Sequence, residues 1–234
     1  MSARAVELVA DELDLMRRML PLAGARVADI GCGNAQMARR LVELRLVASV
    51  AGLEVDAIQH AKNVAAPGVA GLEFRLAGAD AIPFPDASFD IAMMFKSLHH
   101  VPVDRMDAAL AEIRRVLAPG GLAYLSEPVF AGPFNEIVRL FHDEGAVRAA
   151  AVAAIGRAVE RGVLAQVEER HFDAPIAFRD FDDFFERIVK VTHSDISLAG
   201  ERLAEVRRRF EAHATPAGMR FVRPMRVNLL RRPG

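Results

Sequence analysis

Short apolar runs alternate with amphipathic segments along the first half of the chain. Five apolar runs have the length of buried strands: 26–30, 48–53, 72–77, 89–95 and 122–127. Apolar residues at helical spacing occupy intervals between them: 35–45, 56–66 and 103–117. Strands that alternate with helices in this way predict a mostly parallel sheet with helices on both faces. We therefore expect an α/β core over residues 26–130.

The segments on either side of this core are predicted to be mainly helical. The N-terminal apolar residues recur at helical spacing, which predicts a helix within residues 1–22, capped by Ser2 and ended by Pro21. After Pro133 the chain is alanine-rich and helical to about residue 164. The other predicted elements are a strand at 167–178, helices at 181–191 and 198–213, and a last strand at 219–230.

These elements predict a single domain. Residues 133–215 would supply a helical lid, substrate-binding insertions and the sixth strand, and residues 219–231 would form the last strand. The lid helices are expected to close over the strand ends. Five phenylalanines between Phe172 and Phe185 are predicted to be core residues, although they would also suit an apolar acceptor pocket.

Composition excludes several classes of protein. Lys and Arg together number 30 and Asp and Glu 31, so a formal charge of -1 argues against a general nucleic-acid binder. Cys32 is the only cysteine, which excludes an intramolecular disulfide and a cysteine-rich zinc site. Acidic residues interrupt the first twenty positions, and no stretch has the roughly 20 apolar residues of a membrane span. We expect a cytoplasmic protein without a membrane partner; whether it is a monomer or a homodimer is left open.

The segment VADIGCGNA at 27–35 has the chemistry of a ligand-binding turn. A buried strand runs through Asp29 and turns at Gly31 and Gly33 into a helix, which brings backbone N–H groups to a ligand. The dinucleotide fingerprint needs a small residue at the position of Gln36, so a nicotinamide oxidoreductase is disfavoured. A carboxylate at Asp29 opposes phosphate and suits a cationic ligand, while Glu54 ends the next strand and can accept hydrogen bonds from a ribose.

With these motifs the chain resembles the class I S-adenosylmethionine-dependent methyltransferases, specifically the methyltransferase type 11 group. VADIGCGNA is similar to the first motif of that family, and VAGLEVD to its second. IPFPDASFDIAMMFKSLHHV resembles the family's run through strand four, and EIRRVLAPGGLAYLSEP its run through strand five. The resemblance implies a Rossmann-like class I methyltransferase fold with a mostly parallel seven-stranded sheet, an antiparallel last strand and helical lid insertions.

The resemblance also implies a set of cofactor-binding residues. Around the glycine turn, Asp29, Gly31, Cys32 and Gly33 would hold the methionine portion of S-adenosylmethionine, and Glu54 its ribose. The adenine side of the cofactor and the end of strand four would contribute the remaining residues, Val55, Ala79, Asp80, Ala81 and Lys96. Because Cys32 precedes a helix, a lowered thiol pKa is conceivable, but a small packing residue is the favoured interpretation.

Two further residues are candidates for catalysis. His100 follows the fourth strand next to His99, and Glu127 ends the fifth, so both face the edge where ligands bind in open parallel sheets. Either would serve as a base toward an acceptor hydroxyl or amine. The alternatives are a structural cap for the histidine and a surface carboxylate for Glu127. No metal is predicted, because His142, Asp143 and Glu144 are consecutive and do not share a helix face, so a solvated helix end is favoured.

The function expected from these residues is methyl transfer to a small-molecule acceptor by in-line displacement, with S-adenosylhomocysteine as the product. The sulfonium already carries an activated leaving group, so the protein chiefly supplies alignment and exclusion of water. The sequence leaves two alternatives open: a non-catalytic module that binds the cofactor or its product, and a methyltransferase of a protein or RNA. The latter is disfavoured, because FKSLHH stands where an N-P-P-[YF] motif would be found.

Overall fold

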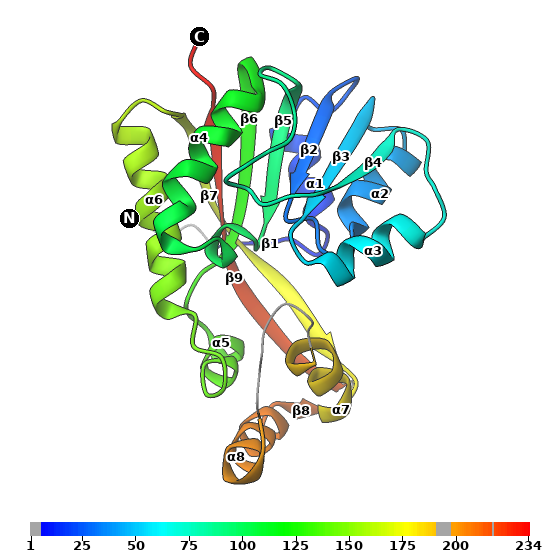
Figure 1. Cartoon of the computed structure of the whole chain (residues 1–234). Coiled ribbons are helices and arrows are strands. Elements are labelled where there is room, and N and C mark those ends of the chain that lie inside the picture. The colour runs from blue at the N-terminus through cyan, green and yellow to red at the C-terminus, as the bar shows by residue number, and fades with distance from the viewer. Residues whose placement is uncertain (1–5, 191–197, 217) are drawn as a thin grey trace.

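The computed structural model describes residues 6–190, 198–216 and 218–234, and in them a single sheet joins nine strands. The order is β1-β7-β9-β6-β5-β2-β3-β4, with β8 paired to β9 (Figure 1). The strands are β1 (Glu7–Leu8), β2 (Arg26–Ile30), β3 (Ser49–Glu54), β4 (Leu72–Leu76), β5 (Phe89–Phe95), β6 (Leu117–Pro128), β7 (Ala165–Phe178), β8 (Ala214–Thr215) and β9 (Gly218–Arg231).

The sheet is parallel from β4 to β6 and becomes antiparallel at β9. Strand β2 pairs in parallel with both β3 and β5, β3 with β4, and β5 with β6. The last strand, β9, lies between β6 and β7 and is antiparallel to both. The predicted fold class is thus confirmed. The predicted sheet has seven strands, and the structure adds β1 and β8 to it. Each of these two strands has only two residues, which is too few to produce a periodic pattern in the sequence.

Helices cover both faces of the sheet. They are α1 (Glu12–Met19), α2 (Gln36–Glu43), α3 (Ala57–Ala65), η1 (Leu98–His100), η2 (Val103–Arg105), α4 (Met106–Val116), α5 (Pro133–Val138), α6 (Gly145–Glu160), α7 (Phe181–Phe184), η3 (Phe185–Val189) and α8 (Gly200–Glu211). Buried residues of α4 and α6 form one apolar cluster with the sheet, and those of α1 and α2 form a second. Among the described helices, none is long and apolar enough to cross a bilayer.

The N-terminal helix is shorter than predicted. It begins after Asp11, whose side chain accepts a hydrogen bond from the Leu13 backbone N–H at 3.0 Å. Ahead of it, Glu7 and Leu8 pair with β7 as a parallel strand. An aspartate at this position favours an N-cap over helix continuation, because its carboxylate satisfies an N–H of the first turn. Ser2, the predicted cap, lies outside the described residues.

Helix α6 is a layer of the core, whereas the sequence placed these residues in a lid. Ala151, Ala154, Ile155 and Ala158 are buried in the cluster that α4 and the sheet share. Arg157 on α6 also binds Asp107 on α4, with Nη2 and Oδ1 2.5 Å apart. Small alanine side chains allow the two helices to pack closely, and the sequence pattern of a buried alanine face resembles that of a mobile helix.

The remaining insertion elements gather at the far ends of β7 and β9. Figure 1 shows these two long strands extending beyond the rest of the sheet to α7, β8 and α8. An aromatic cluster fills this end: Phe134, Phe178, Phe181, Phe184, Phe210 and Phe221 are all buried. The predicted role of the phenylalanines as core residues is confirmed, with Phe172 buried in the cluster of α1 and α2 and Phe185 packed against the aromatic one.

Candidate functional site

The predicted site residues converge on one edge of the sheet. In a parallel sheet the carboxyl ends of all strands lie at the same edge, and β2, β3, β5 and β6 are neighbours there. Gly31 follows β2, Glu54 ends β3, Lys96 follows β5 and Glu127 lies at the end of β6. Segments that are almost a hundred residues apart in sequence therefore border one site.

The glycine turn is shaped by a close approach between two loops. Gly31 has a φ of +70°, and a Cβ on it would lie 2.7 Å from the Cβ of Ser97, the residue after Lys96. The Ser97 hydroxyl donates to the carbonyl of Ile30 at 2.9 Å, which holds the loop after β5 against the turn. Only glycine fits between these loops in this conformation. The sequence analysis identified Gly31 but missed Ser97.

Glu54 is fixed by backbone donors of the turn. Its Oε2 accepts from the Gly33 N–H at 2.8 Å, and its Oε1 accepts from the Asp56 N–H at 2.9 Å. The side chain is buried, with 7% exposure. Each carboxylate oxygen can accept a second hydrogen bond, so the group is held in position and still has acceptor capacity for a hydroxyl pair.

Asp29 is a buried carboxylate behind the same turn. It is 2% exposed, and its side chain makes no hydrogen bond or ion pair with another described residue. Burial, and then the charge of Glu54, raise the pKa of Asp29 to about 7. A cationic group placed beside it would restore the carboxylate form, whereas a phosphate would be repelled.

Cys32 and Asn63 complete the turn. Burial, and then the charges of Asp29 and Glu54, raise the pKa of the Cys32 thiol, so the notion of a lowered pKa is wrong. Asn63 of α3 is buried and donates to the Gly33 carbonyl at 2.7 Å, while Gln59 donates to the Asn63 carbonyl oxygen at 2.9 Å. Asn63 was not predicted; it is the only residue of α3 that is buried, and no pattern in the sequence marks it.

The residues predicted near the adenine lie around the ends of β3 and β4. Val55 directly follows Glu54 and is 72% exposed, as an apolar surface for a planar ring would be. Asp80 accepts from the Arg105 guanidinium at 2.9 Å. Ala79 is buried and Ala81 is exposed. The roles of these four residues toward a ligand stay predictions.

Lys96 is a partly buried cation directly after β5. It has a left-handed φ of 55°, and its backbone N–H donates to the Ser126 carbonyl at 2.7 Å. Its ammonium makes no hydrogen bond or ion pair with a described residue. Burial, followed by the charge of Arg223, lowers the pKa of Lys96, while Glu12 and Glu127 oppose this change. Such a cation suits an anionic group better than a sulfonium, so its assignment to the cofactor stays a prediction.

His99, and not His100, is the histidine at the centre of the site. Both belong to η1, a 3-10 turn in which the His99 ring is buried and His100 is exposed, with ring centroids 4.2 Å apart. The Nδ1 of His99 contacts a carboxylate oxygen of Glu127, and the other oxygen of Glu127 accepts from the Leu98 N–H at 2.9 Å. The alternative of a surface carboxylate for Glu127 is therefore wrong. The choice between the histidines depended on the turn, which the sequence reading took as the end of a strand.

Glu144 joins this histidine from the other side. Its Oε1 lies 3.5 Å from His99 Nε2, and its Oε2 is 2.5 Å from Arg148 Nη2. Glu144 is 8% exposed, so the prediction of a solvated helix end is wrong for it. Burial works against both charges, but the hydrogen bonds with Glu127 and Glu144 raise the pKa of His99 to about 9, and those with His99 and Arg148 lower the pKa of Glu144.

No metal site was predicted from the sequence, but the fold brings three potential metal ligands together. His99, His100 and Glu144 place one ligand atom each within 4.8 Å of one another. We interpret the set as an ion-pair network, because Arg148 already binds Glu144 and its guanidinium opposes a second cation there.

Comparison with known proteins identifies the domain that carries this site. Residues 28–125 match the family described as a methyltransferase domain. In these residues the chain is similar to the class I methyltransferases. The fold as a whole is similar to that of the YcgJ protein of Bacillus subtilis, with a TM-score of 0.63 and 19% identity across 95% of this chain and 98% of that one.

Two curated relatives are similar to part of the chain. A 27-O-demethylrifamycin SV methyltransferase of Amycolatopsis mediterranei is 37% identical over 54% of this chain and 47% of its own. A fatty-acid O-methyltransferase of Mycolicibacterium smegmatis is 38% identical over 42% of this chain and 35% of its own. The chain thus spans less than half of the length of either relative.

The raised pKa of His99 predicts how stability depends on pH. Its folded pKa of about 9 lies above the ordinary 6.5, so its contribution is fully present below 6.5 and is lost as pH rises through 9. Between about pH 6.5 and about pH 9.5 the wild type should lose on the order of 2 kcal/mol more unfolding free energy than His99→Gln. Urea unfolding at both pH values measures this. The exposed His171→Gln is the control; equal losses in wild type and His99→Gln would contradict the ion-pair network.

Proposed function

We propose that this chain is an S-adenosylmethionine-dependent methyltransferase that acts on a small-molecule acceptor by in-line displacement. The observation that carries the proposal is the pair of buried carboxylates, Asp29 and Glu54, at the tips of adjacent strands beside a glycine turn. The match of residues 28–125 to a methyltransferase domain supports it. The two relatives above, whose names specify small molecules, support the acceptor class.

The residues at this edge fit the two ends of the cofactor. Asp29 lacks a partner among the described residues, and an ammonium is the group that a buried carboxylate with a raised pKa would best accept. Glu54 is oriented by two backbone N–H groups and keeps acceptor capacity for the ribose hydroxyls. The exposed Val55 would lie against the adenine. When bound, S-adenosylmethionine supplies a methyl group on a sulfonium, which is already an activated leaving group.

In this proposal the protein contributes alignment more than proton transfer. The acceptor's lone pair forms a bond to the methyl carbon while the carbon–sulfur bond breaks, and the sulfur retains the electron pair. His99 is held as a cation by Glu127 and Glu144, so neither His99 nor Glu127 is placed to take a proton from the acceptor. The earlier candidate His100 keeps an exposed side chain at this edge. We therefore assign His99 and Glu127 to positioning the loop after β5.

Replacing the ribose acid should weaken cofactor binding. We expect Glu54→Gln to bind S-adenosylhomocysteine about tenfold to a hundredfold more weakly, because charge-assisted hydrogen bonds to two hydroxyls would be lost. Titration calorimetry measures the affinity, and a melting curve checks that the turn still folds. Glu43→Gln, which changes an exposed acid at the end of α2, is the matched control. Unchanged affinity in a folded Glu54→Gln protein would sink the assignment.

Cofactor binding should also depend on the protonation of Asp29. Its pKa of about 7 in the free protein would fall when a cation binds beside it, so binding releases a proton. Affinity should rise about tenfold between about pH 6 and about pH 8 in the wild type and stay nearly flat in Asp29→Asn. Calorimetry in buffers of different ionisation enthalpy would detect the released proton. A flat wild-type profile would contradict the proposed contact.

The alternative functions are separated by turnover. A labelled methyl group should move from S-adenosylmethionine to a small-molecule acceptor in a panel of acids, phenols and amines. Binding without turnover on any member would favour a non-catalytic cofactor-binding module. Label transferred only to protein or RNA from a cell extract would favour a macromolecular acceptor.

A further inference from the structure

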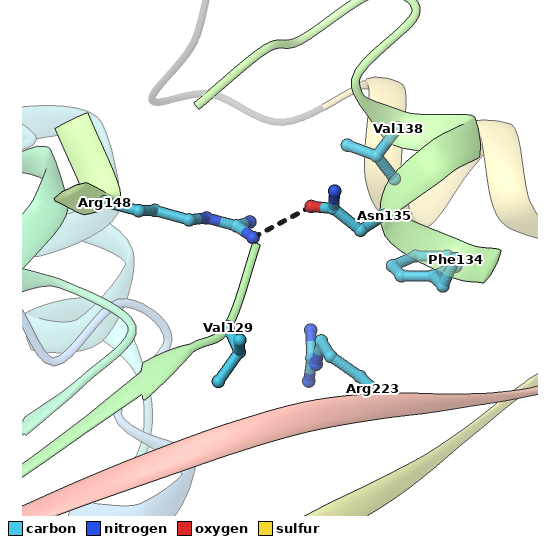
Figure 2. Close-up of a pocket in the computed structure, with 6 residues that line it drawn as sticks. All are labelled: Val129, Phe134, Asn135, Val138, Arg148 and Arg223. Atoms are coloured by element: carbon cyan, nitrogen blue, oxygen red, sulfur yellow. Dashed lines mark hydrogen bonds between the residues drawn. The ribbon is translucent and has the colours of Figure 1, made fainter. Parts of the chain in front are cut away.

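A small cavity lies beyond the end of β6 and is lined by two arginines. It has a volume of about 40 Å³ and lies between the end of β6, α5, α6 and β9. Figure 2 shows Arg148, Asn135 and Arg223 converging on it from three different elements. Its other walls are apolar: Val129, Phe134 and Val138. The space holds a small head group but not a whole drug-sized molecule.

The polar side chains around the cavity offer more hydrogen-bond donors than there are acceptors among the described residues around it. Arg148 donates from Nη1 to the Asn135 carbonyl oxygen at 3.1 Å and from Nη2 to Glu144 at 2.5 Å. The Nε of Arg148, the amide nitrogen of Asn135 and the Nε of Arg223 are buried without a hydrogen-bond partner among the described residues. Arg223 makes no side-chain hydrogen bond or ion pair with any described residue. A buried donor that lacks an acceptor destabilises the fold, so three of them together require an explanation.

The charges around Arg223 also indicate that an anion would be stabilised in the cavity. Burial lowers the pKa of Arg223, and the charge of Arg148 lowers it further, while Glu12 opposes them. Lys96 is a further, partly buried cation, and its pKa is lowered first by burial and then by the charge of Arg223. Glu144 pairs with Arg148, Glu127 contacts His99, and Glu12 accepts from the Tyr124 hydroxyl at 3.1 Å, so none of these three acids pairs with Arg223. An anion that entered the cavity would relieve this repulsion.

We propose that this cavity binds a carboxylate of the methyl acceptor, with Arg223 as its main ligand and Asn135 as a second donor. The inference rests on the proposed function, because it names the acceptor class of the same site. A guanidinium presents a planar fork that matches a carboxylate. Apolar walls at Val129, Phe134 and Val138 suit the carbon next to that group and disfavour a doubly charged phosphate.

The first test measures carboxylate binding directly. The full chain, saturated with S-adenosylhomocysteine, is titrated with acetate, butyrate, octanoate and benzoate, and with octanamide and inorganic phosphate. At least one carboxylate should bind saturably and raise the melting temperature, whereas the amide should not. Arg223→Gln should weaken that carboxylate at least tenfold. Arg220→Gln, an exposed arginine three residues away on β9, should leave it unchanged. Equal binding by the amide, preference for phosphate, or no binding by any carboxylate overturns the proposal.

The second test separates a ligand-binding arginine from a structural one. Removing an unpaired buried cation relieves its desolvation cost, so Arg223→Met should melt at the same temperature as the wild type or higher without added anion. Arg148→Met should melt lower, because it removes the guanidinium that pairs with Glu144 and donates to Asn135. If Arg223→Met loses as much stability as Arg148→Met, Arg223 is a structural residue and the inference fails.

The two proposals fail in different ways. A wild type that binds S-adenosylhomocysteine but no carboxylate retains the proposed function and loses the inference. A wild type that binds no S-adenosylhomocysteine loses the proposed function, and the same carboxylate titration of the ligand-free protein still tests the cavity. In Arg223→Gln the affinity for S-adenosylhomocysteine should change less than twofold, since Arg223 is assigned to the acceptor.

Discussion

The carboxylate of Glu54 organises this edge of the molecule through two backbone N–H groups. One donor belongs to Gly33 in the turn after β2 and the other to Asp56 in the turn after β3, so a single side chain ties two loops together. Asp29 lies behind it on the neighbouring strand, where burial and the charge of Glu54 disfavour ionisation. Two like charges in one buried place are costly unless a ligand compensates for them. The turn therefore holds two carboxylates close together in a buried place, and a cation is the ligand that would stabilise both of them.

The edge is divided electrostatically along the sheet. Asp29 and Glu54 lie on β2 and β3, whereas the cations Lys96, Arg148 and Arg223 lie around the carboxyl ends of β5 and β6, where Glu127 and Glu144 pair with His99 and Arg148. His99 lies near the cationic end and is kept protonated by Glu127 and Glu144. A cofactor with an ammonium and a sulfonium fits the first half, and an acceptor with a carboxylate fits the second. Because the two ligands would carry opposite charges, each would bind in its own half of the edge. The acceptor would then lie on a fixed side of the cofactor, as in-line displacement requires.

The parts of the site that the sequence predicted are those built from neighbouring residues. Asp29, Gly31, Gly33 and Glu54 lie in two short segments whose strand–turn chemistry is readable without the rest of the chain. Contacts between distant segments were not readable. His99 meets Glu127 and Glu144 only after η1 has formed and α6 has packed on α4. Arg223 was not predicted, because nothing near it in sequence shows that β9 places it beside α5 and α6. The placement of α6 in a lid has the same cause. From the sequence alone, a helix with a buried alanine face cannot be told from a mobile helix; the helix that it packs against must be known.

The packing of α6 connects the scaffold with the acceptor side of the site. Its alanine face and the pair between Arg157 and Asp107 fix the helix on α4, and its first turns carry Glu144 and Arg148 to the strand ends. One wall of the cavity is therefore part of the rigid core. The opposite wall comes from α5, a six-residue helix that belongs to the insertion after β6. Changes in α5 can alter the shape of the acceptor pocket without disturbing the cation that α6 presents. Under the proposal, Arg223 recognises the charge of the acceptor and α5 recognises its shape. Substitutions in α5 would then change the acceptor while the proposed carboxylate contact is kept.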